Sequence, residues 1–165
     1  MQICYLAHLT SNDVPSLVRL YTDPITRKYL GGALENSKAI TRAFSCIQTP
    51  RILPIWSIRS TTDHRFLGTI SLDFHHDGLD IEVSYELLPE SMGKGYATQA
   101  LSFVLSYSFN KLNLKKIIAE TQTSNKASIK LLKRIGMSFE KNVKRYDSDQ
   151  SIYSITNDQY LNKIF

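Results

Sequence analysis

The sequence predicts an α/β (α+β) domain with a mixed, largely antiparallel sheet, a central parallel strand pair and helices on both faces. Segments with the two-residue period of strands alternate along the chain with segments of helical apolar spacing. Across residues 81–121 a strand, a helix and a strand follow one another, which is typical of a parallel pair joined by a right-handed crossover. The other strands follow each other as hairpins, so we expect a mixed sheet.

The first half of the chain is expected to contain two helices between strands. Polar N-cap candidates at residues 10–13 precede the first helix, and Asp23-Pro24 ends it. The second helix ends before Pro50 for the same reason. The expected elements are a strand at 3–9, a helix to about residue 21, a helix at 35–47, and strands at 53–60 and 66–74.

The central strand ends at Pro89, which cannot donate to a sheet ladder. Apolar residues recur at Val83, Tyr85 and Leu87, the period of a strand with one buried face. The helix that follows the glycine turn is expected to run to about Asn110.

The last third of the chain predicts a strand, a helix and a final hairpin. The strand at 115–121 carries Ile117-Ile118-Ala119, a short apolar run expected to be buried on both faces. The helix at 125–135 is stopped by Gly136 as its left-handed C-terminal residue. The hairpin is expected at 137–146 and 151–155.

Composition and charge narrow the function classes. The 165 residues suit one domain, spanning 1–165, and an apolar content of 42% with 21% charged residues is typical of a soluble globular protein. No apolar run could span a bilayer and the N-terminus lacks the pattern of a signal peptide, so we expect a cytoplasmic protein. Cys4 and Cys46 lack metal-ligand spacing and are expected to be free thiols.

The formal net charge of +5 favours an anionic ligand or partner. The basic residues are spread along the chain without a long tract, which disfavours nucleic acid as the main ligand. His75 and His76 are adjacent at a predicted hairpin tip, where we expect a surface turn and no metal site. The sequence leaves monomer and homodimer open.

Gly93-Lys94-Gly95 lies where the central strand passes into the next helix. A helix N-terminus carries unpaired N–H groups and the positive end of the peptide dipole, and glycines let an anion approach them. The turn is therefore either a phosphate cradle or an ordinary strand-to-helix turn. It matches neither the P-loop pattern nor the Rossmann fingerprint.

The run from Gly93 to Leu101, G-K-G-Y-A-T-Q-A-L, resembles the pyrophosphate-binding motif of the GNAT superfamily of N-acetyltransferases. More narrowly, it resembles the G-K-G-Y-A-T-E-A-L run of the ribosomal-protein N-terminal acetyltransferase branch. Glu90 departs from the pattern, which has Gln or Arg there. The resemblance implies acetyl-CoA as cosubstrate, no metal, and cofactor-binding residues at Gly93, Lys94, Gly95, Tyr96 and Ala97.

A second stretch, from Asn125 to Met137, resembles the N-x-x-S-x-x-x-L-x-x-x-G-[FM] pattern of the same family. The resemblance implies that Asn125 contacts the pantetheine arm. Leu132 stands where many members carry a Tyr that protonates the departing thiolate, so Ser128 is implied to lie near the sulfur instead. The alternative is that Ser124 or Asn125 is an N-cap and Ser128 bonds its own helix.

Acetyl transfer to an amine needs a proton acceptor, and the central strand offers Glu82 and Glu86 on one face. Glu82 matches the carboxylate that the resembled branch uses as base; the alternative is a solvated sheet carboxylate. Backbone N–H groups around Leu87 and Leu88 are expected to polarise the thioester carbonyl. Tyr146 and Tyr153 of the last hairpin either line the acceptor side or pack in the core.

The expected function is therefore acetyl-CoA-dependent N-acetylation of a primary amine by direct transfer in a ternary complex. A peptide or protein N-terminal α-amine is favoured because residues 22–50 contain only Asp23 and Glu35 as acids. The alternatives are a polyamine or aminoglycoside acetyltransferase and a non-catalytic acyl-CoA sensor. The residues expected to act in catalysis are Glu82 and Ser128.

Overall fold

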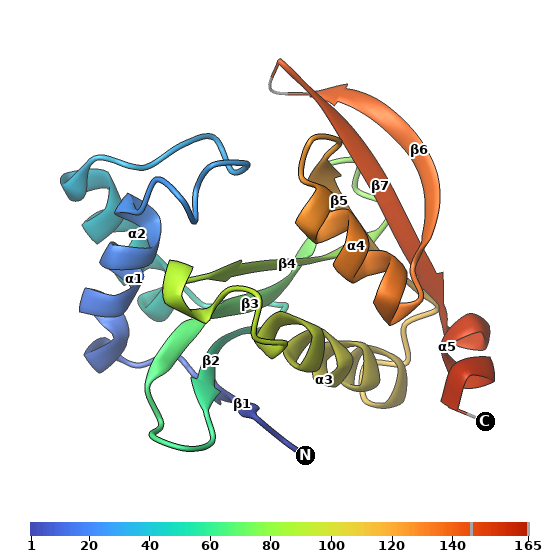
Figure 1. The fold of residues 1–165 in the computed structure, drawn as a ribbon, viewed down its shortest axis with the longest axis horizontal. Helices are drawn as coiled ribbons and strands as arrows, with labels where there is room; N and C mark the ends of the chain where they lie inside the picture. Colours follow the sequence, from blue (N-terminus) through green and yellow to red (C-terminus); the bar gives the residue numbers. More distant parts are fainter. Residues whose placement is uncertain (146, 165) are drawn as a thin grey trace. The chain divides into compact units, whose positions relative to one another are not determined.

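A computed structural model describes residues 1–145 and 147–164, in which the chain forms seven strands and five α-helices (Figure 1). The strands are hydrogen-bonded in the order β1-β2-β3-β4-β5-β7-β6, mostly antiparallel, with β4 and β5 parallel. The predicted fold class is thus confirmed. The elements are β1 (Cys4–His8), α1 (Val14–Thr22), α2 (Asn36–Gln48), β2 (Ile55–Ser60), β3 (Phe66–Phe74), β4 (Ile81–Leu87), α3 (Tyr96–Asn110), β5 (Lys116–Gln122), α4 (Lys126–Ile135), β6 (Ser138–Arg145), β7 (Ser148–Thr156) and α5 (Asn157–Ile164).

The chain divides into two compact units. The first unit contains Met1–Ser71 and Tyr85–Ala100, and the second contains Leu72–Ser84 and Leu101–Phe165. Strands β3 and β4 and helix α3 each contribute residues to both units. The expectation of a single domain over 1–165 stays a prediction. In the described part of the chain, no helix is both long enough and apolar enough to cross a membrane.

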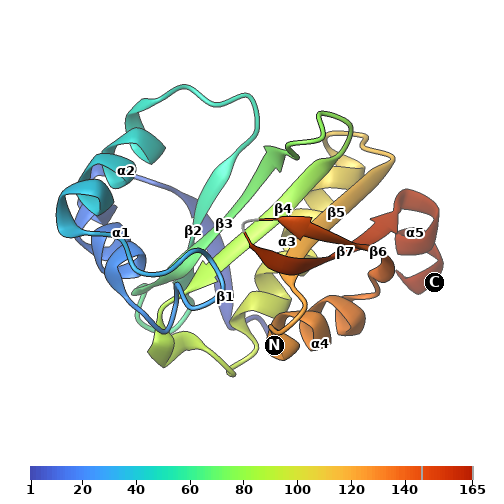
Figure 2. The ribbon, with the colours of Figure 1, turned by 90° about the horizontal axis from the view of Figure 1, so that it is seen from above.

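In the first unit, α1 packs against α2, as both ribbon views show (Figures 1 and 2). Apolar residues of α1 at helical spacing meet small residues of α2, so the two helices approach closely. The buried cluster consists of Leu17, Leu20, Tyr21, Ala39, Ala43, Phe66 and Leu88. This cluster joins the helix pair to the strand that ends just before the glycine turn.

Gln99 ties the first strand to the first turns of α3. Its side-chain oxygen accepts hydrogen bonds from the N–H groups of Ile3 at 2.7 Å and Cys4 at 2.9 Å. These bonds satisfy backbone donors at the edge strand of the sheet, which would otherwise be open to other chains. Gln99, which follows the glycine turn, therefore also stabilises the packing of β1 against α3.

In the second unit, β7 pairs with β5 on one side and β6 on the other. Strands β6 and β7 form the long hairpin drawn in orange and red in Figure 1. Ile117, Ile118 and Ala119 are buried, which confirms the predicted two-sided burial of this run. Gly136 has φ of 99° at the end of α4, the left-handed C-terminal residue that was predicted.

One helix was not predicted, and one expectation is wrong. Helix α5 was not predicted, although Thr156 and Gln159 exchange hydrogen bonds as a capping box: the Thr156 N–H donates to Oε1 of Gln159, and the Gln159 N–H to Oγ1 of Thr156. His75 was expected in a surface turn but is 2% exposed. The turn does occur, since the Gly78 N–H donates to the His75 carbonyl, but the imidazole faces inward towards Glu120 on β5.

Candidate active site

The glycine turn before α3 presents a set of unpaired backbone donors. Gly93 and Gly95 have φ of 73° and 86°, the left-handed region that favours glycine. Among the residues that the structure describes, no backbone or side-chain acceptor is bonded to the N–H groups of residues 93–97. A Cβ at Gly93 would meet nothing within 4 Å, so the space above the turn is open. An anion with several oxygens, such as a pyrophosphate, fits such a donor set.

Glu90, the position that departs from the family pattern, has a structural partner. Its carboxylate accepts two hydrogen bonds from Arg19 of α1, at 2.7 and 3.0 Å. Both side chains are exposed, so the pair stabilises the turn only modestly. The bidentate contact neutralises the Glu90 charge a few residues before the turn and so limits its repulsion of an anion there.

Some backbone groups at the end of β4 are already hydrogen-bonded within the chain, which limits the N–H groups that could polarise a thioester carbonyl. The N–H of Leu88 donates to the carbonyl of Leu67 at 2.9 Å, so the expectation that Leu88 polarises a thioester is wrong for this donor. The carbonyl of Leu87 accepts from the Thr26 hydroxyl at 2.8 Å. The expected donor role of the Leu87 N–H stays a prediction.

Asn125 is the N-cap of α4. Its side-chain oxygen accepts a hydrogen bond from the Ser128 N–H at 3.2 Å. This confirms the capping alternative for Asn125 and places Ser128 in the first turn of the helix. Leu132, one turn further along, is fully buried and belongs to the core.

Glu82 lies near the start of β4 in the second unit, where it pairs in register with Ile118 of β5. It is half-buried, so its carboxylate is only partly solvated. Burial raises the pKa of Glu82 to about 7, with a smaller opposing effect from His75 and further raising effects from Glu120 and Asp73. A carboxyl group with this pKa exchanges a proton readily near neutral pH.

Glu86, in the first unit, has a different environment. Its Oε1 lies 3.2 Å from Nη1 of Arg27 and 3.4 Å from Nη2 of Arg42. The Arg27 and Glu86 side chains are 7% and 13% exposed, so this is a largely buried ion pair. Oε2 of Glu86 has no hydrogen-bond partner within the described residues and can accept one from a bound ligand. The sequence interpretation did not identify the arginines, which lie far from Glu86 in the chain.

A cluster of charged groups surrounds Glu120 on β5. Its Oε2 lies 2.8 Å from Nε2 of His75 and 3.8 Å from Nε2 of His76, and its Oε1 lies 3.5 Å from Nε of Arg145. The ligand atoms of His75, His76 and Glu120 lie within 4.8 Å of one another. A tetrahedral zinc ion would hold its ligand atoms about 3.3 Å apart. The 2.8 Å contact of His75 is instead that of a hydrogen bond.

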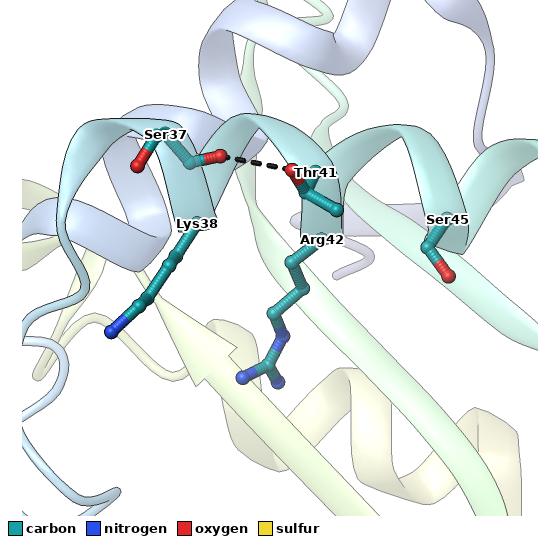
Figure 3. A pocket seen from close by; sticks show the side chains of 5 residues that line it. All are labelled: Ser37, Lys38, Thr41, Arg42 and Ser45. Carbon is teal, nitrogen blue, oxygen red and sulfur yellow. Dashed lines mark hydrogen bonds between the residues drawn. The ribbon is translucent and has the colours of Figure 1, made fainter.

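An open hollow of about 400 Å³ lies on α2 in the first unit. Its lining residues are Ser37, Lys38, Thr41, Arg42 and Ser45. Figure 3 shows the side chains of Lys38 and Arg42 extending to the same side of the helix. The Arg42 guanidinium also lies over the Tyr21 ring, 4.5 Å from its centroid. The hollow is therefore basic.

The structure divides the predicted site residues between the two units. The glycine turn, Leu87 and Leu88 belong to the first unit, whereas Glu82, Asn125 and Ser128 belong to the second. Of the hairpin tyrosines, Tyr153 is buried and packs edge-on against Phe139, as the core alternative predicted. Tyr146 lies outside the described residues. Glu120 was missed because nothing in its local sequence signals which groups β5 faces.

Comparison with known proteins identifies acetyltransferases as relatives of this chain. Residues 4–138 match the family described as acetyltransferase (GNAT) domain. An uncharacterized N-acetyltransferase of Bacillus subtilis, YoaA, is 31% identical, with 91% of each chain covered. The crystal structure of a GNAT-family acetyltransferase from Bacillus anthracis superposes with a TM-score of 0.83 at 19% identity, covering 95% of this chain and 96% of that one. Spermidine N-acetyltransferase from Vibrio cholerae, solved with CoA and spermine, gives 0.82 at 20% identity, covering 96% and 98%.

Proposed function

Since this chain belongs to the GNAT family of acetyltransferases, we propose that it acetylates a peptide or protein N-terminal α-amine, with acetyl-CoA as the donor. The observation that supports acetyl-CoA as the acetyl donor is the glycine turn. The N–H groups of residues 93–97 have no acceptor among the described residues, and the space above Gly93 is open. Unpaired N–H groups at the start of a helix suit the pyrophosphate of CoA.

The reaction is a direct transfer in a ternary complex. The neutral amine nitrogen bonds to the thioester carbonyl carbon, the carbon–sulfur bond breaks, and CoA leaves as a thiolate. Glu82 accepts the proton that the amine loses, and the thiolate takes a proton from water. Ser128 hydrogen-bonds the sulfur as charge develops on it, Asn125 holds α4 in place, and the Leu87 N–H polarises the carbonyl.

The proposed α-amine acceptor is supported by two features. An α-amino group has an ordinary pKa of about 7.7–8, so a base of modest strength such as Glu82 suffices to deprotonate it. The two acids of residues 22–50 are also engaged: Asp23 accepts from the Thr26 N–H at 2.7 Å, and Glu35 lies 3.9 Å from Lys38.

The test is release of free CoA from acetyl-CoA across a panel of acceptors: peptides with different N-terminal residues, the same peptides with blocked N-termini, spermidine and an aminoglycoside. We expect release with unblocked peptides alone. Blanks without acceptor correct for the thiols of Cys4 and Cys46. Mass spectrometry of the product locates the acetyl group.

The other outcomes identify the alternatives. Release with spermidine or the aminoglycoside alone contradicts the peptide acceptor but keeps the acetyltransferase. Binding of acetyl-CoA without release to any amine favours a sensor. The expected cytoplasmic location and the choice between monomer and homodimer are checked by cell fractionation and by size-exclusion chromatography with light scattering.

A further inference from the structure

The hollow on α2 is bordered by a cation that is held from two sides. Arg42 lies over the Tyr21 ring, 4.5 Å from its centroid, and its Nη2 lies 3.4 Å from Oε1 of Glu86. The Arg42 side chain is still 43% exposed, and it lines the hollow. A guanidinium carries five N–H donors in a planar fork, so one contact with Glu86 leaves donors for a second carboxylate.

The hollow keeps an excess of positive charge, because Glu86 is already compensated by Arg27. These two side chains form the largely buried pair, with Nη1 of Arg27 3.2 Å from Oε1 of Glu86. Lys38 extends to the same side of α2 as Arg42 (Figure 3). Its Nζ lies 3.9 Å from Oε2 of Glu35, and both of these side chains are exposed, so this ion pair is weak. Three cations thus stand against two carboxylates.

The hollow adjoins the end of β4, where the thioester carbonyl is proposed to be polarised. Glu86, which Arg42 contacts, directly precedes Leu87, whose N–H is the proposed donor to that carbonyl. These residues and the lining of the hollow all belong to the first unit. An extended peptide advances about 3.3–3.6 Å per residue. A peptide whose α-amine reaches the carbonyl can therefore place one of its next few side chains in the hollow.

We propose that the α2 hollow binds a carboxylate of the acceptor and that Arg42 determines specificity, so that peptides with aspartate or glutamate at their second to fourth residues are preferred. The carboxylate accepts hydrogen bonds from Arg42 and is attracted by Lys38. The short side chains of Ser37, Thr41 and Ser45 leave room for it in a volume of about 400 Å³. The inference rests on the proposed peptide acceptor, and the net charge of +5 agrees with an acidic partner.

The experiment measures kcat and KM of the full chain with three peptides that share an N-terminal serine. Their second and third residues are both aspartate, both asparagine or both lysine, and the remaining residues are identical. The KM for the aspartate peptide should be about fivefold lower than that for the asparagine peptide, and the lysine peptide should have the highest KM. The preference should shrink at 1 M salt, where the Debye length is about 3 Å.

Arg42→Gln should raise the KM for the aspartate peptide about fivefold and leave the KM for the asparagine peptide unchanged. A merely structural role would instead lower kcat with all three peptides. Lys38→Glu reverses an exposed charge at the hollow and should shift the preference towards the lysine peptide. Because Lys38 is exposed, this variant keeps the test informative even if Arg42→Gln does not fold.

Lys28→Gln is the matched control. It removes the same charge from another cation that lies over a ring in the first unit, since Nζ of Lys28 is 5.2 Å from the Tyr29 ring centroid. Lys28 does not line the hollow, so this variant should keep the preference of the unchanged chain.

The outcomes separate the subsite from the proposed function. Release of CoA with none of the peptides, in protein that binds acetyl-CoA, overturns both. Equal kinetics with all three peptides keep the peptide acceptor and overturn the acidic subsite. A preference that folded Arg42→Gln and Lys38→Glu retain, or that Lys28→Gln loses to the same extent, belongs to charges elsewhere and overturns the inference. A preference that falls only in the two hollow variants supports it.

Discussion

At the scale of single residues, β4 carries two acidic side chains in opposite electrostatic settings. Glu82 is partly buried and its pKa is raised to about 7, mainly because burial disfavours the charged form. The negative charge of Glu86 is compensated by Arg27 and Arg42. One strand therefore holds a carboxyl group that exchanges protons near neutral pH and another that is held in an ion pair.

Replacing Glu82 with Gln should stabilise the protein at pH 8 while it removes most of the activity. A folded pKa of about 7 against an ordinary 4.5 means that the charged group opposes folding above pH 7. The cost develops as pH rises from 4.5 to 7, and at ~1.36 kcal/mol per unit it is at most about 3 kcal/mol. Urea unfolding of both proteins at pH 8 and at pH 4.5 measures the difference in their free energies of unfolding. The stabilisation of Glu82→Gln should vanish at the lower pH.

Glu86→Gln is the control on the same strand, and its effect on stability should have the opposite sign. It leaves the largely buried Arg27 without its charged partner, which should lower the free energy of unfolding by about 3 kcal/mol. If both variants destabilise the protein equally at pH 8, the charged form of Glu82 does not oppose folding.

At the scale of elements, two helix N-termini differ in whether their N–H groups are hydrogen-bonded within the described chain. The turn before α3 leaves its N–H groups open to a ligand, whereas the N-terminus of α4 is capped by its own Asn125. The difference follows from the sequence, since α3 is preceded by glycine and α4 is preceded by Asn125, whose side chain accepts a hydrogen bond.

Gly93→Ala should raise the KM for acetyl-CoA about tenfold, equivalent to about 1.4 kcal/mol of lost binding. Its φ of 73° is strained for alanine, so the turn changes shape and its N–H groups change direction. Steady-state kinetics at saturating acceptor measures the effect. Gly78→Ala is the matched control, because Gly78 has φ of 72° and the same open space but lies in a hairpin of the other unit. An equal rise in KM for both variants would contradict the role of the turn.

Asn125→Ala should lower the free energy of unfolding by about 1 kcal/mol, because the cap on the Ser128 N–H is lost. Asn125→Asp keeps an acceptor at the cap and should retain the stability. The KM for acetyl-CoA distinguishes the two roles. If Asn125 donates to pantetheine as well, the Asp variant keeps its stability but binds acetyl-CoA more weakly; an unchanged KM would restrict Asn125 to capping.

At the scale of the whole molecule, acetyl-CoA should stabilise the folded chain. A ligand at a hundred times its Kd adds about 2.7 kcal/mol to the free energy of unfolding, or roughly 5–10 °C in Tm for a chain of this size. Acetylpantetheine, which lacks the pyrophosphate, should give a much smaller shift at equal concentration. Differential scanning calorimetry measures both, and equal shifts would contradict pyrophosphate binding at the glycine turn.

The sequence by itself determined most of the helices and strands of this protein and the glycine turn before α3. Side-chain period, prolines and glycines act within a few residues, so the strand before Pro89, the turn at Gly93 and the C-terminal residue Gly136 were all predictable. Helix α5 follows the same local rule, because Thr156 and Gln159 form a capping box at its start.

Only the tertiary structure decided which charges meet. Arg27 reaches Glu86 across 59 positions, and His75 reaches Glu120 across 45. Such pairs depend on which strands lie side by side and on which face each side chain is buried, and local period carries neither piece of information. The energy of a charge depends on burial and on its partners, so the sequence could nominate Glu82, but its raised pKa and its neighbours came from the fold.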